Sequence, residues 1–133
     1  MNIEEIEGIG PAMGAKLKEA GIGTVEKLLA AGASKKGRTE LEESTGIAGD
    51  KILKFVNHAD LIRVKGIGPQ FAELLEAAGV DTVKEFKSRN AANLHAKMKE
   101  VNDEKNLVNG MPSLGQLEAM IEEAKSMEYL VTH

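Results

Sequence analysis

The stretch IEEIEGIGPAMGAKLKEAGIGTVEKLLA, Ile3–Ala30, decides the fold because it returns 58 residues later as LIRVKGIGPQFAELLEAAGVDTVKEFKS, Leu61–Ser88. The two segments align without a gap, and 9 of the 28 positions are identical. Self-similarity at a fixed spacing indicates a duplicated structural unit. We therefore expect two tandem units, residues 1–60 and 61–133, that together form one compact globule.

Each unit is expected to be all-α. Apolar residues recur at helical spacing after Pro11, a residue that helices tolerate at their first position. Gly21 stands where such a helix commonly ends, and Thr24 would cap the next one. No segment shows the alternation of a strand, so no sheet is expected. Further helices are expected over residues 38–44, 50–59 and 91–106 and from Ser113 onward.

The sequences Gly8-Ile9-Gly10-Pro11 and Gly66-Ile67-Gly68-Pro69 lie between expected helices, and each is followed by a small residue and then a leucine at fixed spacing. This pattern resembles the helix-hairpin-helix motif, G-h-G-x-x-x-A-x-x-L. Its glycines allow a tight turn and a close approach to the backbone. The N–H groups at the start of the following helix favour an anion such as a phosphate.

Two weaker copies of this hairpin follow, at Gly46-Ile47-Ala48 and at Gly110-Met111-Pro112. The resemblance therefore implies two tandem, pseudo-symmetric double helix-hairpin-helix units. It also implies a bundle of short helices like that of SAM-like domains and of the N-terminal domain of DNA polymerase beta.

Beyond the hairpin motif, the chain resembles a bacterial family known only as domain of unknown function 4332. The resemblance extends over most of the chain, and it implies a fold without implying a function. The residues that carry it are Gly37-Arg38 with Leu41, Thr45-Gly46-Ile47, Asp60-Leu61 with Arg63, Gly79-Val80-Asp81-Thr82-Val83, Asn93-Leu94-His95-Ala96-Lys97-Met98 and Pro112-Ser113-Leu114.

Composition argues against several function classes. The chain has no cysteine, its three histidines lack the spacing of metal ligands, and no serine has a partner constellation. We therefore expect no enzyme, no cofactor and no metal. A monovalent cation at the hairpin carbonyls is implied only by the motif class, and no residue here selects one. No apolar window is long enough to span a membrane and no signal peptide is visible, so a cytoplasmic protein without a membrane partner is expected.

The helix-hairpin-helix class implies weak, sequence-independent contact with the phosphates of duplex DNA. Three glutamates precede the first hairpin, whereas Arg63 and Lys65 precede the second, so we expect DNA chiefly at the second hairpin. DNA-binding members of the class often carry a cation two residues after the second glycine of the hairpin. Here that position is Ala12 in the first hairpin and Gln70 in the second. The expected nucleic-acid-binding residues are Arg63, Lys65, Gly66, Gly68 and Gln70, with Gly8, Gly10, Lys35, Lys36, Arg38 and Lys51 assisting.

The overall charge keeps a second interpretation open. A net charge of −4 is unusual for a strong nucleic-acid binder, and 3% aromatic residues leave little for base stacking. The alternative is an acidic module that binds an unidentified protein or a second copy of itself, with hairpins that only pack helices. The sequence does not indicate the oligomeric state.

The last expected helix carries a wide apolar stripe that must be buried. A short connection favours antiparallel packing on the preceding helix, along Leu94, Met98 and Val101. Deleting residues 113–133 is expected to unfold or aggregate the protein, whereas the effect of deleting only Tyr129 to His133 is expected to be mild. The stripe consists of Leu114, Leu117, Met120, Ile121, Ala124 and Met127.

Overall fold

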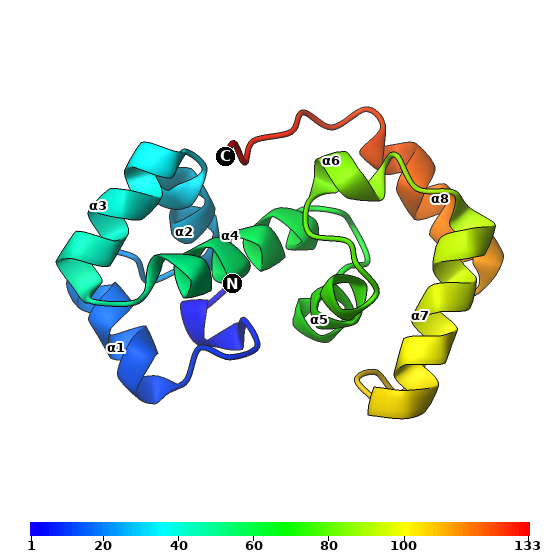
Figure 1. Cartoon of the computed structure of the whole chain (residues 1–133), viewed down its shortest axis with the longest axis horizontal. Helices are drawn as coiled ribbons and strands as arrows, with labels where there is room; N and C mark the ends of the chain where they lie inside the picture. The colour runs from blue at the N-terminus through cyan, green and yellow to red at the C-terminus, as the bar shows by residue number, and fades with distance from the viewer. The chain divides into compact units, whose positions relative to one another are not determined.

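A computed structural model describes residues 1–133 as a set of helices without strands (Figure 1), which confirms the all-α prediction. One isolated backbone bridge pairs Asn2 with Thr24. None of the helices combines the length and apolar character needed to cross a membrane. In chain order the elements are the 3-10 helix η1 (Ile3–Glu5) and the helices α1 (Pro11–Glu19), α2 (Val25–Gly32), α3 (Lys35–Thr45), α4 (Gly49–Ile62), α5 (Pro69–Ala77), α6 (Val83–Phe86), α7 (Ala91–Lys105) and α8 (Leu114–Ala124).

The chain forms two compact units. The first consists of Met1–Asp60 together with Leu130–His133, and the second consists of Leu61–Tyr129. The last four residues, which the sequence analysis placed with the second unit, therefore belong to the first. The change of unit falls within α4, so no loop marks it.

Local signals explain where the helices begin. Thr24 and Thr82 accept hydrogen bonds from the backbone N–H groups three residues on, and these bonds start α2 and α6. Ser34 does the same for α3 through the N–H of Gly37, which is why α3 starts three residues before the predicted helix. Gly46 ends α3 in the left-handed conformation, with φ of 73°.

Each unit has its own apolar interior. In the first unit α2 packs on α3, and α1 packs on η1. In the second unit α7 packs on both α5 and α8, and α6 packs on α8. The predicted contact between the last helix and the helix before it is confirmed. Leu117, Ile121 and Ala124 carry that contact from the interior, whereas Leu114 is 38% exposed and lies outside it.

The C-terminal tail packs against the first unit. Val131 is only 6% exposed, although its neighbours Leu130 and Thr132 are exposed. The backbone N–H of Thr132 donates to the carbonyl of Ala33 at 2.8 Å. The Arg38 guanidinium donates to the carbonyl of Thr132 at 2.5 Å. These contacts lead us to expect that loss of the tail destabilises the first unit more than the mild effect expected from the sequence.

Val131→Asp is expected to release the tail and to destabilise the first unit by about 1.5–3 kcal/mol, the free energy gained by burying one such side chain. Leu130→Asp is the matched control, because Leu130 is 39% exposed and a substitution there changes stability by roughly 0.5 kcal/mol or less. Urea unfolding followed by circular dichroism compares the two variants. Equal unfolding midpoints would show that the tail does not stabilise the first unit.

Candidate nucleic-acid interface

The second hairpin is the turn between α4 and α5. Gly66 has a φ of +95°, and a Cβ added there would lie 2.8 Å from Cε of Met120 on α8. Ile67 is buried and anchors the turn in the core of the second unit. Gly68 then forms the N-cap of α5, with Pro69 as the first helical residue. The first glycine of this hairpin is therefore required by backbone conformation and by packing.

The first hairpin repeats this arrangement in the first unit. Gly8 also has a φ of +95°, and a Cβ there would lie 3.2 Å from Cε1 of Phe55 on α4. Ile9 is buried, and Gly10 forms the N-cap of α1. In both hairpins a side chain from a later helix thus covers the first glycine.

The second glycine of each hairpin has no internal reason to be glycine. Gly10 has φ of −84° and Gly68 has φ of −98°, values that any residue adopts. A Cβ added at either position would meet no atom within 4 Å. Neither helix start is capped by a side chain, although a serine or aspartate there would supply one. Both positions therefore leave the first N–H groups of a helix open to an external acceptor.

Acidic residues surround the first hairpin and take part in its fold. The Glu4 side chain lies over Gly14, where an added Cβ would come within 2.6 Å of its Cγ, and its carboxylate pairs with Lys18 Nζ at 3.2 Å. Glu5 accepts a hydrogen bond from the backbone N–H of Asn2 at 2.8 Å and completes a capping box. Glu4 thus holds a carboxylate, paired with Lys18, against the first turns of α1, where no basic residue flanks the hairpin as Lys65 does in the second unit.

Basic residues flank the second hairpin instead. Lys65 is exposed, and Arg63 is half-buried and donates to the carbonyl of Glu128 at 2.7 Å. Gln70 is exposed in the first turn of α5. The structure thus brings Arg63, Lys65, Gly66, Gly68 and Gln70 together in one turn of the second unit. The other residues predicted to assist lie in the first unit.

Arg38 is not available to a phosphate, which corrects its inclusion among the expected binding residues. Its side chain is 7% exposed and donates to the carbonyls of Gly32 at 2.9 Å, Ala33 at 3.0 Å and Thr132 at 2.5 Å. Burial lowers the pKa of the Arg38 guanidinium. Sequence reasoning missed this role because the carbonyl of Thr132 lies 94 residues away in the chain.

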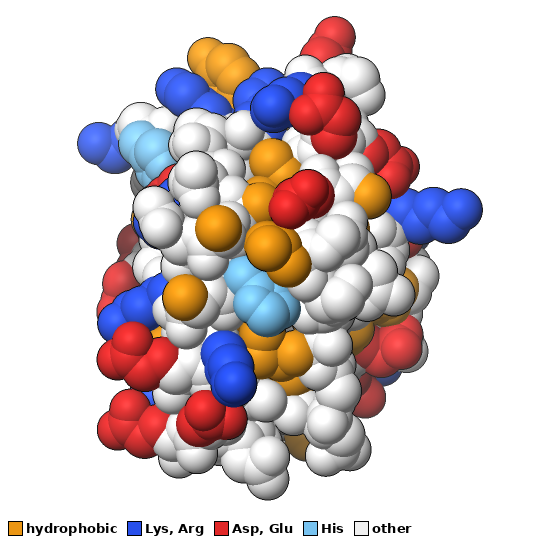
Figure 2. All heavy atoms as spheres, turned by 90° about the vertical axis from the view of Figure 1, so that its right-hand side faces the viewer, with side chains coloured by type: hydrophobic (Ala, Val, Ile, Leu, Met, Phe, Trp, Pro, Cys, Tyr) orange, Lys and Arg blue, Asp and Glu red, His pale blue; other side chains and the backbone are white.

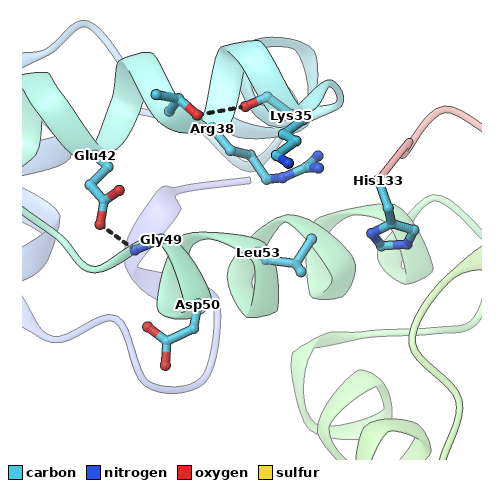
Figure 3. A pocket seen from close by; sticks show the side chains of 8 residues that line it. Lys35, Arg38, Glu42, Gly49, Asp50, Leu53 and His133 are labelled. Atoms are coloured by element: carbon cyan, nitrogen blue, oxygen red, sulfur yellow. Dashed lines mark hydrogen bonds between the residues drawn. The ribbon is translucent and has the colours of Figure 1, made fainter.

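Lys35 and Lys36 lie in the first turn of α3, and Lys51 lies in the first turn of α4, all exposed. Lys35 also lines a pocket of about 330 Å³ between α3, α4 and the tail (Figure 3). Glu42 and Asp50 line the same pocket, with Glu42 accepting from the N–H of Gly49 at 2.8 Å. Because acidic residues line this pocket together with the cations, it does not suit a phosphate.

Two lysines that the sequence analysis did not single out lie in the second unit. Lys87 Nζ donates to the carbonyl of Met127 at 3.1 Å, and Lys84 Nζ lies 4.7 Å from the centre of the Tyr129 ring. The distribution of charge along the sequence gives one indication of a basic region that includes them. Residues 61–90 carry a net charge of +1, whereas residues 1–33, 34–60 and 91–133 carry −2, 0 and −3.

The face of the second unit that carries α7 and α8 has a mixed surface. Figure 2 shows small hydrophobic areas around a histidine, with acidic and basic side chains both among them and at the edges. His95 on α7 lies 2.9 Å, through Nε2, from the carbonyl of Pro112. No group of three or more residues with metal-binding side chains occurs in the chain. This face offers no continuous basic surface.

Comparison with known proteins identifies a family and no closer relative. The sequence profile of the family described as "Domain of unknown function (DUF4332)" matches residues 7–127. No curated protein and no solved structure matches the chain significantly.

Proposed function

The chain belongs to the family of domain of unknown function 4332, and we propose that it is a non-catalytic module that binds duplex DNA weakly and without sequence preference. The observation that carries this proposal is the second glycine of each Gly-Ile-Gly-Pro hairpin. Gly10 and Gly68 cap helices without a side chain, in a conformation open to every residue and with free space beside them. A bound group that must approach the backbone closely would explain why glycine stands at these two positions.

The same proposal assigns the fold to two tandem double helix-hairpin-helix units. It is supported by backbone conformations that repeat at the spacing of the sequence repeat. Gly21 and Gly79, which follow α1 and α5, have φ values of 86° and 93°. The two first glycines share a φ of 95°. The units also differ, since α2 has eight residues where α6 has four.

Phosphate binding at the second hairpin would use backbone and side-chain groups together. A phosphate oxygen in front of Gly68 accepts from the N–H groups of residues 70 and 71, which have no partner within α5 because they belong to its first turn. The helix dipole favours the negative charge there, and the exposed ammonium group of Lys65 adds to it. None of these groups contacts a base edge, so binding would carry no sequence preference.

The protein-binding alternative has less support from the surface. Its large exposed hydrophobic side chains are Met1, Leu114, Tyr129 and Leu130, of which only Tyr129 and Leu130 are neighbours in the chain. The first glycines of the hairpins fit a purely structural role, but the second glycines do not. We therefore treat protein binding with structural hairpins as the outcome that follows if DNA binding fails.

Fluorescence anisotropy with a labelled duplex of mixed sequence tests the proposal. Contact with about 2–4 phosphates predicts a slope of roughly −2 to −4 in a plot of log K against log salt concentration, at about −0.9 per phosphate. The dissociation constant is expected in the non-specific range of ~10⁻⁴–10⁻⁶ M. Absence of binding at low salt would favour the protein-binding alternative.

Glu7→Lys is expected to strengthen DNA binding, because it gives the first hairpin the cation that Lys65 gives the second at the repeat spacing. One additional phosphate contact steepens the salt slope by about 0.9. Glu7→Gln is the control that removes the negative charge without adding a positive one, and its effect is expected to be smaller. If Glu7→Lys binds no better than wild type in the anisotropy assay, the first hairpin takes no part in binding.

A further inference from the structure

Three cationic side chains of the second unit converge on three consecutive residues near the C-terminus. Arg63 donates to the carbonyl of Glu128 at 2.7 Å, and Lys87 donates to the carbonyl of Met127 at 3.1 Å. Lys84 lies over the ring of Tyr129, with its Nζ 4.7 Å from the ring centre. The cations come from the turn after α4 and from α6 and its C-cap. We call residues 127–129 the strap.

The strap holds these cations mainly through neutral groups. Backbone carbonyls and an aromatic ring carry no net charge, so the positive charges of Lys84 and Lys87 stay in place after the contacts form. Glu128 supplies the only carboxylate of the strap, and its side chain is exposed. The nearby Glu85 is paired with Arg89 at 2.8 Å. Lys84 and Lys87 therefore keep their positive charge while the strap lies on them.

The strap itself has little regular structure to hold it. It follows the end of α8 at Ala124 and contains no helical residue. The Met127 side chain packs partly against the core of the second unit and fixes the start of the strap. Beyond it, Glu128 is exposed and Tyr129 is 50% exposed. The residues that follow the strap are anchored again, by the buried Val131 and by the hydrogen bonds of Thr132. Only the short segment between these anchors has to turn aside to uncover the cations, and no helix is disturbed.

We propose that Arg63, Lys84 and Lys87 form a second phosphate-binding site beside the hairpin, covered by the strap and opened when a DNA phosphate replaces it. The inference rests on the proposed function, since it extends the DNA surface outward from the second hairpin. Phosphate oxygens accept charge-assisted hydrogen bonds that are roughly twice as strong as those to neutral carbonyls, so a phosphate competes well for these donors. Arg63 belongs to both sites, which makes the two contiguous.

Tyr129→Ala tests the inference in the full-length chain, because it removes the ring over Lys84 and loosens the strap. We expect tighter binding of the labelled duplex and a salt slope steeper by about 0.9 for each phosphate gained. Tyr129→Phe keeps the ring and is expected to bind like wild type. Adding Lys84→Gln and Lys87→Gln to Tyr129→Ala is expected to abolish the gain. Circular dichroism confirms that each variant is folded.

Equal affinity and equal salt slope for Tyr129→Ala and Tyr129→Phe would overturn the inference. If no variant binds DNA, the hairpin proposal fails, and inorganic tripolyphosphate then decides the strap site by itself. Titration followed by nuclear magnetic resonance is expected to shift the Lys84 and Lys87 signals more in Tyr129→Ala than in Tyr129→Phe. Indistinguishable shifts in the two variants would overturn the strap site as well.

Discussion

Deletion of residues 113–133 is expected to unfold the second unit. Leu117 and Ala124 are fully buried and Ile121 nearly so, and α8 packs on both α6 and α7. Burying a leucine or isoleucine side chain is worth about 1.5–3 kcal/mol. Because a domain is stable by only ~5–15 kcal/mol in total, the loss of α8 removes a large fraction of that stability. Circular dichroism melts are expected to show no cooperative transition for the second unit.

Point variants separate α8 from the tail, which the deletion also removes. Leu117→Ala is expected to cost about 2–5 kcal/mol, the usual range for a leucine truncated in a core. Leu114→Ala, on the same helix but 38% exposed, is the matched control and is expected to cost roughly 0.5 kcal/mol or less. If the deletion melts cooperatively and the two point variants are equally stable, α8 is a detachable arm, and the protein-binding alternative gains support.

The double variant Arg63→Glu, Lys65→Glu is expected to abolish DNA binding. It reverses both charges beside the second hairpin, where the uncapped start of α5 is the proposed phosphate site. Because each lost phosphate contact removes one released counterion, the salt dependence is expected to vanish together with the affinity. Fluorescence anisotropy at low salt measures both quantities.

A control with the same change of net charge separates a local effect from a general one. Lys99→Glu with Lys105→Glu alters two exposed lysines on α7, away from both hairpins in the sequence. This variant is expected to retain most of the binding. If both double variants lose affinity equally, net charge alone governs binding and the hairpin has no special role.

The sequence predicted the helices well because the residues that start and end a helix lie within a few positions of its ends. Pro11, Thr24 and Ser113 stand at helix starts as expected, and the last helix packs on α7 as its stripe requires. The start of α3 was placed too late because Ser34 was not recognised as its cap. The exposure of Leu114 was also missed, since a stripe read along one helix does not show where its partner helix ends.

Contacts between distant parts of the chain could not be predicted in this way. The sequence predicted that Arg38 is available to a phosphate, whereas in the structure the carbonyl of Thr132 accepts a hydrogen bond from its guanidinium. Nothing in the sequence indicated the contacts that Lys84 and Lys87 make with residues 127–129, and only the structure reveals them. In each case a backbone carbonyl or an aromatic ring from the C-terminal segment is the partner. No periodicity or short motif encodes such a pairing.

Gly68→Ser tests the central claim most directly, because it separates the fold of the hairpin from its proposed binding of phosphate. The φ of −98° and the open space at Gly68 accept a side chain, and a serine there is expected to cap the first N–H groups of α5. The free energy of unfolding is expected to stay the same or to rise by a few tenths of a kcal/mol. In the anisotropy assay we predict that this stable variant loses its affinity for duplex DNA. Unchanged affinity would contradict the account and leave the hairpins as devices that only pack helices.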